Sequence, residues 1–307
     1  MTIKRHILAA LMTVSAAVAV NAQETKEQFA ERYSLLASRL GPGGVGIETL
    51  VRKWEEAYPD DLDMLSAKFM YYYSKSRSTE IVVREGSRYL GKEPVLALKD
   101  SLGRDVNYFE EPVFDDELFS AGQQAIERAA KLYPDRLDLR FNKSASLLDY
   151  EKGSPDMTLS YLQSLVEYNY TAHPSWTFNG GPVDNETFCA LMQEYCYGMF
   201  KLATPNAYEA FRALSETMLA YNPDNPLFLD NIGSYYFVGK KDGKTALKWY
   251  NKVLKNHPDD ITAITNCILL ARRDKNVKLE KKYLPMLMRY GSETEQKQAE
   301  ARLNSLK

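Results

Sequence analysis

The residues of this sequence that come closest to a catalytic motif are Gly243, Lys244 and Thr245. A phosphate-binding P-loop has four residues between its first glycine and such a triplet, so that backbone N–H groups surround the phosphates. The position required for that first glycine is Val238, and Gly239 leaves only three residues between. The stretch therefore fails the spacing rule, and we predict a turn between two helices rather than a nucleotide site.

A row of sulfur side chains in the helix expected after Asp184 is the second candidate. Thiolate and thioether sulfurs are ligands that copper(I) prefers, and four of them lie along one side of this helix: Cys189, Met192, Cys196 and Met199. The other faces of the helix are also apolar, which is typical of a helix buried on all sides. Cysteine and methionine are ordinary core residues in such a helix, so we expect packing and no metal site.

The sequence gives little support for acid–base or nucleophilic catalysis. His173 and His257 have no cysteine or carboxylate at metal-ligand spacing, and no serine stands in a nucleophile elbow. Paired acids fall where helices are expected to begin, at 60–61, 115–116 and 259–260. Carboxylates there favour the positive end of the helix dipole. We therefore expect neither an enzyme nor a bound cofactor.

The elements that would position these side chains are amphipathic helices, punctuated by a recurring Pro-Asp step. The step occurs at Pro59, Pro134, Pro223 and Pro258. The last two prolines are 35 residues apart, and the first two are 75 apart, close to two such units. A period of about 34 residues with a helix-ending proline is typical of helix-turn-helix repeats. The sequence thus predicts an all-α solenoid of antiparallel helix pairs.

Residues 223–260 carry the clearest unit, and it resembles the tetratricopeptide repeat (TPR) family. The matching positions are Ile232-Gly233 and Tyr236 in the first helix, Ala246, Tyr250 and Val253 in the second, and the closing Pro258. The small residues let two helices approach closely, and the tyrosines fill the flanking space. One residue more than the family pattern stands in the turn.

The resemblance implies that a protein or peptide partner binds in a concave groove lined by the first helices of the repeats. The family's groove positions correspond to Asp230, Ser234 and Phe237 and, on the following helix, to Thr262, Thr265, Leu269 and Arg272. Some family members hold a C-terminal carboxylate with a basic clamp. Asp230 occupies one position of that clamp, so a clamp of this type is not expected here.

One segment departs from helical periodicity. Residues 93–112 hold two β-prone runs, 95–99 and 105–109, around a Gly-containing turn. We predict a β-hairpin inserted between N-terminal helical repeats (23–92) and further TPR-like repeats (113–307) that end in a capping helix. An irregular stretch at 170–185 is long enough for a functional role to be considered.

The N-terminus and the charge balance limit the class of protein. Residues 1–22 combine a basic start with a short apolar run and small residues before a cleavage site, as secretory signal peptides do. We expect an exported chain, periplasmic or secreted, with no membrane span after cleavage. The net charge of −2 and the lack of a basic run argue against nucleic-acid binding.

These observations favour an exported, non-enzymatic TPR-like scaffold for a protein or peptide partner. A carbohydrate-binding envelope protein is the alternative, because the sequence is rich in tyrosine and Trp176 stands in the irregular stretch. That alternative requires exposed aromatic side chains on the irregular loops. A purely structural role, organising an envelope complex through broad contacts, is a third class.

Overall fold

Helices follow one another along almost the whole chain, and the polar residues between them act as caps. The computed structural model describes residues 24–306, so the signal peptide expected at residues 1–22 lies outside the described residues. Within them the helices are α1 (Lys26–Leu40), α2 (Ile47–Ala57), α3 (Leu62–Ser76), α4 (Asp116–Leu132), α5 (Leu137–Glu151), α6 (Asp156–Ala172), α7 (Asn185–Lys201), α8 (Pro205–Tyr221), α9 (Pro226–Ser234), α10 (Gly243–Asn256), α11 (Ile261–Arg273), α12 (Val277–Tyr290) and α13 (Glu293–Ser305).

The Pro-Asp steps separate a second helix from the next first helix, as their spacing predicts. Asp61 and Asp260 each accept a hydrogen bond from a backbone N–H in the first turn of the helix that follows, at 3.0 and 2.8 Å. The acidic pairs at these two turns therefore supply helix caps. Ser292 and Glu295 form a capping box at the start of α13.

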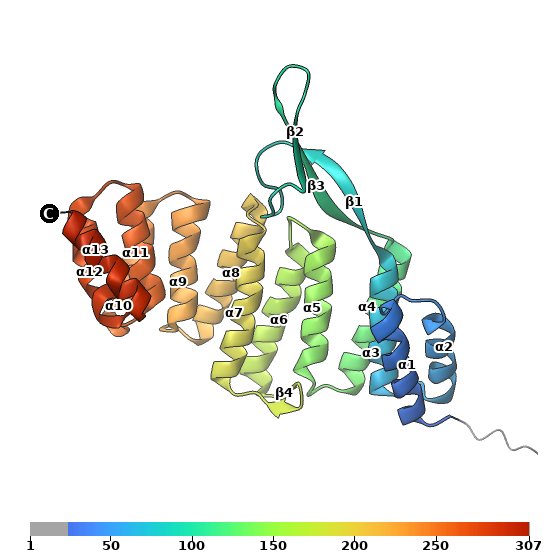
Figure 1. The fold of residues 1–307 in the computed structure, drawn as a ribbon. Helices are drawn as coiled ribbons and strands as arrows, with labels where there is room; N and C mark the ends of the chain where they lie inside the picture. Colours follow the sequence, from blue (N-terminus) through green and yellow to red (C-terminus); the bar gives the residue numbers. More distant parts are fainter. Residues whose placement is uncertain (1–23, 307) are drawn as a thin grey trace, which may run out of the picture.

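Successive helices stack side by side from α1 at one end to α13 at the other (Figure 1). Three hydrophobic clusters fill the stack: one around α1–α4, one around α5–α8 and one around α9–α13. The prediction of an all-α solenoid of helix pairs with a small β insertion is confirmed. Among residues 24–306, none of the helices has the length and apolar character needed to cross a membrane.

The β insertion is larger than a hairpin and forms an arm that projects from the edge of the helical stack (Figure 1). Its strands are β1 (Arg77–Arg84), β2 (Leu96–Lys99) and β3 (Asp105–Phe114), in the antiparallel order β1-β3-β2. Strands β2 and β3 lie where the sequence suggests a hairpin. Strand β1 directly continues α3, inside the range expected to be helical.

Two further segments bear on the sequence interpretation. The Gly-Lys-Thr stretch begins α10, with Asp242 capping the helix through the backbone N–H of Thr245 at 3.0 Å. Just before it, α9 continues into a π-helical turn, η1 (Tyr235–Gly239). The irregular stretch at 170–185 contains a small pair of strands, β4 (Thr177–Phe178) and β5 (Gly181–Pro182).

Candidate functional site

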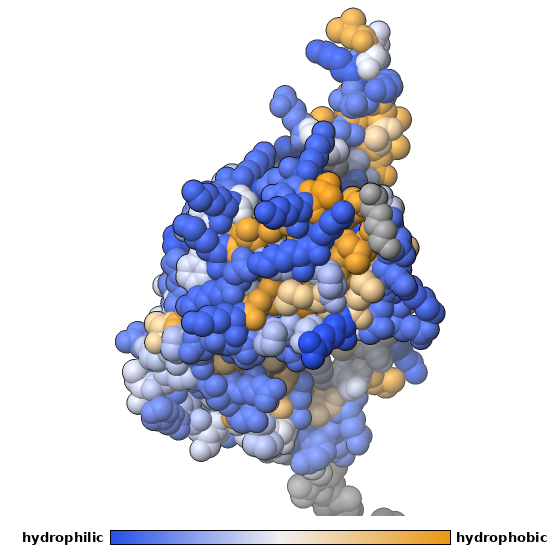
Figure 2. All heavy atoms as spheres, turned by 90° about the vertical axis from the view of Figure 1, so that its left-hand side faces the viewer, coloured by the Kyte–Doolittle hydropathy of each residue, from blue (hydrophilic) through white to orange (hydrophobic). Residues whose placement is uncertain are grey.

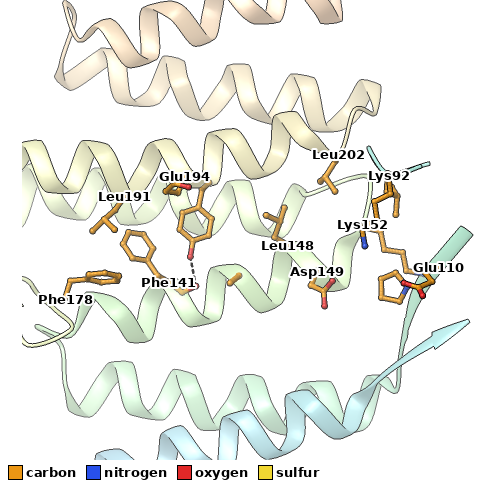
Figure 3. A pocket seen from close by; sticks show the side chains of 14 residues that line it. Lys92, Glu110, Phe141, Leu148, Asp149, Lys152, Phe178, Leu191, Glu194 and Leu202 are labelled. Carbon is orange, nitrogen blue, oxygen red and sulfur yellow. Dashed lines mark hydrogen bonds between the residues drawn. The ribbon is translucent and has the colours of Figure 1, made fainter. Parts of the chain in front are cut away.

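A cavity of about 500 Å³ opens between α5 and α7, the first helices of two neighbouring pairs. Its lining also includes Phe178 from β4, Leu90 and Lys92 from the loop between β1 and β2, and Glu110 and Pro112 from β3. Both features that interrupt the helical pattern therefore contribute to one site. Figure 3 shows the aromatic side chains at one end of this cavity, with Glu194 beside them, and Lys92, Lys152, Asp149 and Glu110 towards the other end.

Aromatic side chains build the apolar end. The rings of Phe141 and Phe178 meet edge to face with centroids 5.9 Å apart, and the rings of Phe141 and Tyr195 are 5.1 Å apart. Tyr195 donates its hydroxyl proton to the backbone carbonyl of Phe141 at 2.7 Å, which fixes its ring across the gap between the helices. Leu191, Ala145 and Leu148 complete this apolar wall.

Two of the charged residues at the other end are already neutralised. The Nζ of Lys152 lies 2.8 Å from Glu111 on β3, and this contact lowers the pKa of Glu111 to about 2. Asp149 accepts hydrogen bonds from Arg77 Nε at 2.6 Å and from the Tyr73 hydroxyl at 2.8 Å. These contacts join the C-terminal end of α5 to the base of the arm.

Three other charged residues stand at the rim of the cavity with no such partner. Lys92, Glu110 and Glu194 are exposed, and none of them forms an ion pair within residues 24–306. The rim thus offers two carboxylates and one ammonium group to a ligand. Together with the aromatic wall, this arrangement can hold an apolar group beside a positively charged one.

The position of the cavity follows the repeat register. Phe141, Ala145 and Leu148 stand 7, 11 and 14 residues after Pro134, as Asp230, Ser234 and Phe237 stand after Pro223. The cavity therefore lies at the groove positions of an earlier repeat. The sequence contained this signal, but the weaker match of that repeat to the TPR pattern left it unassigned. Phe178 and the arm residues could not be found in this way, because they approach from separate segments.

The predicted groove residues on α9 and η1 lie in different surroundings. Asp230 is buried, with 5% of its surface exposed, and its Oδ1 atom has no hydrogen-bond partner. Ser234 is half-buried and shares a hydrogen bond with the Tyr250 hydroxyl at 3.2 Å. Phe237 lines a second hollow at the end of η1, where the Arg273 guanidinium lies 4.7 Å from its ring.

The predicted residues on α11 are more accessible, with one exception. Thr262 and Leu269 are exposed and Thr265 is half-buried. Arg272 is already engaged: its Nε donates to the buried Glu280 at 2.6 Å, and Arg302 of α13 binds the same carboxylate. Asp230 and Arg272 are thus committed to the interior and to an ion pair, whereas the remaining five are available to a ligand to different degrees.

The other sequence candidates have structural roles. Cys189, Met192, Cys196 and Met199 are all buried in the cluster around α5–α8, as expected for core packing. Within the described residues, no group of three or more His, Cys, Asp and Glu is arranged to hold a metal ion.

Trp176 does not have the exposure that the carbohydrate alternative requires. Only 3% of its surface is exposed, because it packs into the cluster around α5–α8 and under Arg140, whose guanidinium lies 5.0 Å from the ring. Its indole Nε1 donates to Asn169 at 3.0 Å. Trp176 therefore anchors the irregular stretch to the helices.

No family model matches the sequence, and no curated protein matches it. Among solved structures, the chain is similar to one described as a functional characterization of Pseudomonas aeruginosa pilF, at 10% identity over 90% of this chain and 96% of that chain. The TM-score is 0.36.

Proposed function

We propose that this protein is a non-catalytic, TPR-like scaffold that binds a segment of a partner polypeptide, with the cavity between α5 and α7 as the anchor site. The observation that carries this proposal is the combination of an aromatic wall with an unpaired acidic rim in one cavity of about 500 Å³. Ligand sites of this kind are mostly apolar, with a few polar groups that fix orientation.

The chemistry of the cavity supports a particular kind of segment. A large apolar side chain would pack among Phe141, Phe178 and Leu191. A lysine or arginine next to it would lie near Glu194, which makes no ion pair within the described chain, whereas Glu110 stands at the other end of the cavity (Figure 3). We therefore expect the partner segment to present an apolar residue followed or preceded by a basic one.

The test is selection from a random peptide display library, followed by affinity measurement with two variants. Ala145 is exposed and lies in the wall of the cavity on α5. Ala145→Arg keeps a good helix former but fills the cavity. Loss of one buried anchor side chain, about 1.5–3 kcal/mol, should weaken binding about tenfold to a hundredfold.

Ala190→Arg is the matched control, because Ala190 is exposed on α7 but does not line the cavity. Selected peptides should be rich in apolar–basic pairs and should bind this control as they bind the wild type. Peptides that bind all three proteins equally well, or no enrichment at all, would contradict the proposal. Glu194→Lys should separately abolish the preference for basic residues.

A longer partner would continue along the groove over α9 and α11, where the resemblance to the TPR family suggests further contacts. Ser234, Phe237, Thr262, Thr265 and Leu269 are the accessible members of that set. Phe237→Ala should then weaken a partner that spans both sites and leave a short peptide in the cavity unaffected. Equal affinity of the variant and the wild type for every long partner would remove these residues from the site.

We also infer that the protein works outside the cytoplasm, in the periplasm or as a secreted protein, on the basis of the signal-peptide pattern at residues 1–22. N-terminal sequencing of the protein from its host should find a chain that begins near residue 23. An intact Met1 in the mature protein would overturn this inference.

A further inference from the structure

Strand β1 presents an unpaired edge. The sheet order is β1-β3-β2, so residues 77–84 pair with β3 on one side only. No backbone hydrogen bond from elsewhere in residues 24–306 reaches the other side of this strand. The arm that carries it projects from the helical stack (Figure 1), and hydrophobic residues gather along one of its sides (Figure 2). An edge of this kind is a template for another strand.

This edge is only partly protected. Exposed edge strands of soluble proteins commonly carry charged side chains, especially lysine, or a proline or bulge that prevents pairing. Strand β1 has no lysine, proline or bulge, and its charged residues Arg77, Glu80 and Arg84 stand around the β-branched run Ile81-Val82-Val83. More than half the surface of Ile81 and of Val83 is exposed, at 58% and 54%. The strand therefore resembles a pairing surface more than a protected edge.

Glu80 has no favourable partner within the described chain. It stands opposite Glu111 in the sheet register, and like charges in that relation are destabilising. Glu111 itself is already bound by Arg84, Lys152 and Tyr89. Glu80 makes no ion pair among residues 24–306. The carboxylate of Glu80 therefore destabilises the sheet slightly, unless a basic side chain of another molecule lies next to it.

We propose that β1 pairs antiparallel with β1 of a second copy of this chain, about a two-fold axis at Val82. In that register Glu80 lies opposite Arg84 of the second copy, and Arg84 lies opposite Glu80 of the second copy. Ile81 and Val83 face one another in the same reciprocal way on the other face of the sheet. The ion pair between Glu80 and Arg84 therefore forms twice, once on each side of the axis, as the symmetry of an isologous interface requires.

Charge complementarity and strand pairing together select the second copy as occupant. Arg84 keeps its contact with Glu111 at 2.6 Å, and 40% of its side chain is exposed, so it can bridge Glu111 and Glu80 of the second copy. The paired arms would form one six-stranded sheet in the order β2-β3-β1-β1-β3-β2. In this register only residues 80–84 of each strand lie opposite residues of the other β1, so the contact buries much less than the roughly 1,600 Å² of a standard interface. Association should therefore be weak and concentration-dependent.

Charge reversal tests the register. In sedimentation velocity, the wild type should shift from monomer to dimer as concentration rises, whereas Glu80→Arg and Arg84→Glu should each remain monomeric. Each variant places like charges opposite one another in its own dimer. An equimolar mixture of the two restores opposite charges across the axis and should recover dimers. Circular dichroism checks that each variant is folded.

Cysteine substitution provides a second readout that does not depend on charge. The three native cysteines are unpaired and buried. Two copies of Val82→Cys would face each other across the axis at about 4.5–5.5 Å between Cα atoms, a separation that a disulfide spans. Oxidised Val82→Cys should form covalent dimers alone. Ile81→Cys and Val83→Cys should form them efficiently only with each other.

Several outcomes would overturn the proposal. A wild type that stays monomeric at every concentration would show that a second copy of the chain is not the partner of this edge. A dimer that persists unchanged in Glu80→Arg, or disulfides that form equally at 81, 82 and 83, would place the contact elsewhere. Because none of these measurements involves the cavity between α5 and α7, they are independent of the proposed peptide binding.

Discussion

At the scale of single residues, Asp230 combines burial with an unsatisfied oxygen. Burial, together with the smaller effect of the neighbouring Asp260 carboxylate, raises the pKa of its carboxyl to about 8. Asp260 is held in place because it caps α11 through the backbone N–H of Ala263. The TPR resemblance places Asp230 in the groove. In the structure its side chain instead occupies the interface between α9 and the turn before α11.

This burial predicts a pH dependence of stability. Because the folded-state pKa of Asp230 is raised above its unfolded value, its stabilising contribution is complete below about pH 4 and is lost as pH rises towards about 8. Asp230→Asn keeps the shape but cannot ionise. At pH 8 and above the variant should be more stable than the wild type, by on the order of 1–3 kcal/mol. Urea denaturation across this pH range measures the difference.

Asp224→Asn provides the control, since Asp224 is exposed in the turn before α9. It should leave the pH dependence of the urea midpoint as in the wild type. If Asp230→Asn also keeps the wild-type pH dependence, the carboxyl of Asp230 is ionised in the folded state and the argument from burial is wrong.

At the scale of elements, the arm shows what the sequence could and could not predict. The Gly-containing turn between β2 and β3 is local, and its two flanking runs lie where the sequence suggests them. Strand β1 has no such signal, because α3 passes into it at Ser76-Arg77 without glycine or proline. Its partner is β3, more than 20 residues away, and pairing at that distance leaves no turn pattern to detect.

Pro112 lies within β3, although proline is usually excluded from the middle of a sheet. Strand β3 is paired on both sides only at residues 107–108, where β1 and β2 both pair with it. At Pro112 it has β1 on one side alone, opposite Thr79, so the missing N–H costs nothing if it faces the free side. The helices and caps could be predicted because their signals are local. The α5 wall of the cavity follows the repeat register, but the rest of the cavity could not be predicted, because segments distant in sequence meet there.

Gly91 attaches the arm to the helical stack and yields a prediction at this scale. Its φ is +75°, and an added Cβ would lie 1.8 Å from the carbonyl oxygen of Lys201 at the end of α7. Gly91→Ala should therefore push the loop away from α7 and displace Leu90 and Lys92 from the cavity. Hydrogen exchange at residues 85–99 should accelerate, and affinity for cavity-binding peptides should fall.

Gly86→Ala separates crowding from backbone strain. Gly86 also has a positive φ, +88°, but an added Cβ would come no closer than 3.9 Å to any atom. Both variants incur the cost of a left-handed alanine, about 1 kcal/mol, whereas only Gly91→Ala meets the α7 backbone. Equal exchange rates in the two variants would show that the loop does not depend on its contact with Lys201.

At the scale of the whole molecule, the three hydrophobic clusters define how stability is distributed. Helix α5 contributes Leu139 to the cluster around α1–α4 and Phe141 to the next one. Leu219 and Tyr236 lie between the second and third clusters and pack against both. Each cluster thus contacts only its neighbour. In such an array, stability is approximately a sum of local terms and nearest-neighbour terms.

Gly233→Ala tests this distribution, because it damages one end of the stack at a known contact. An added Cβ would lie 2.5–2.9 Å from three ring atoms of Tyr250, a side chain with no exposed surface in which to move. Overpacking of this kind costs about 1–3 kcal/mol. We expect faster hydrogen exchange throughout α9–α13, with exchange in α1–α4 unchanged.

Gly198→Ala serves as control, since its Cβ would meet only the flexible end of Leu148, at 3.2 Å. If Gly233→Ala instead accelerates exchange equally from α1 to α13, the solenoid unfolds as one cooperative unit. The boundaries between the clusters would then carry no energetic meaning.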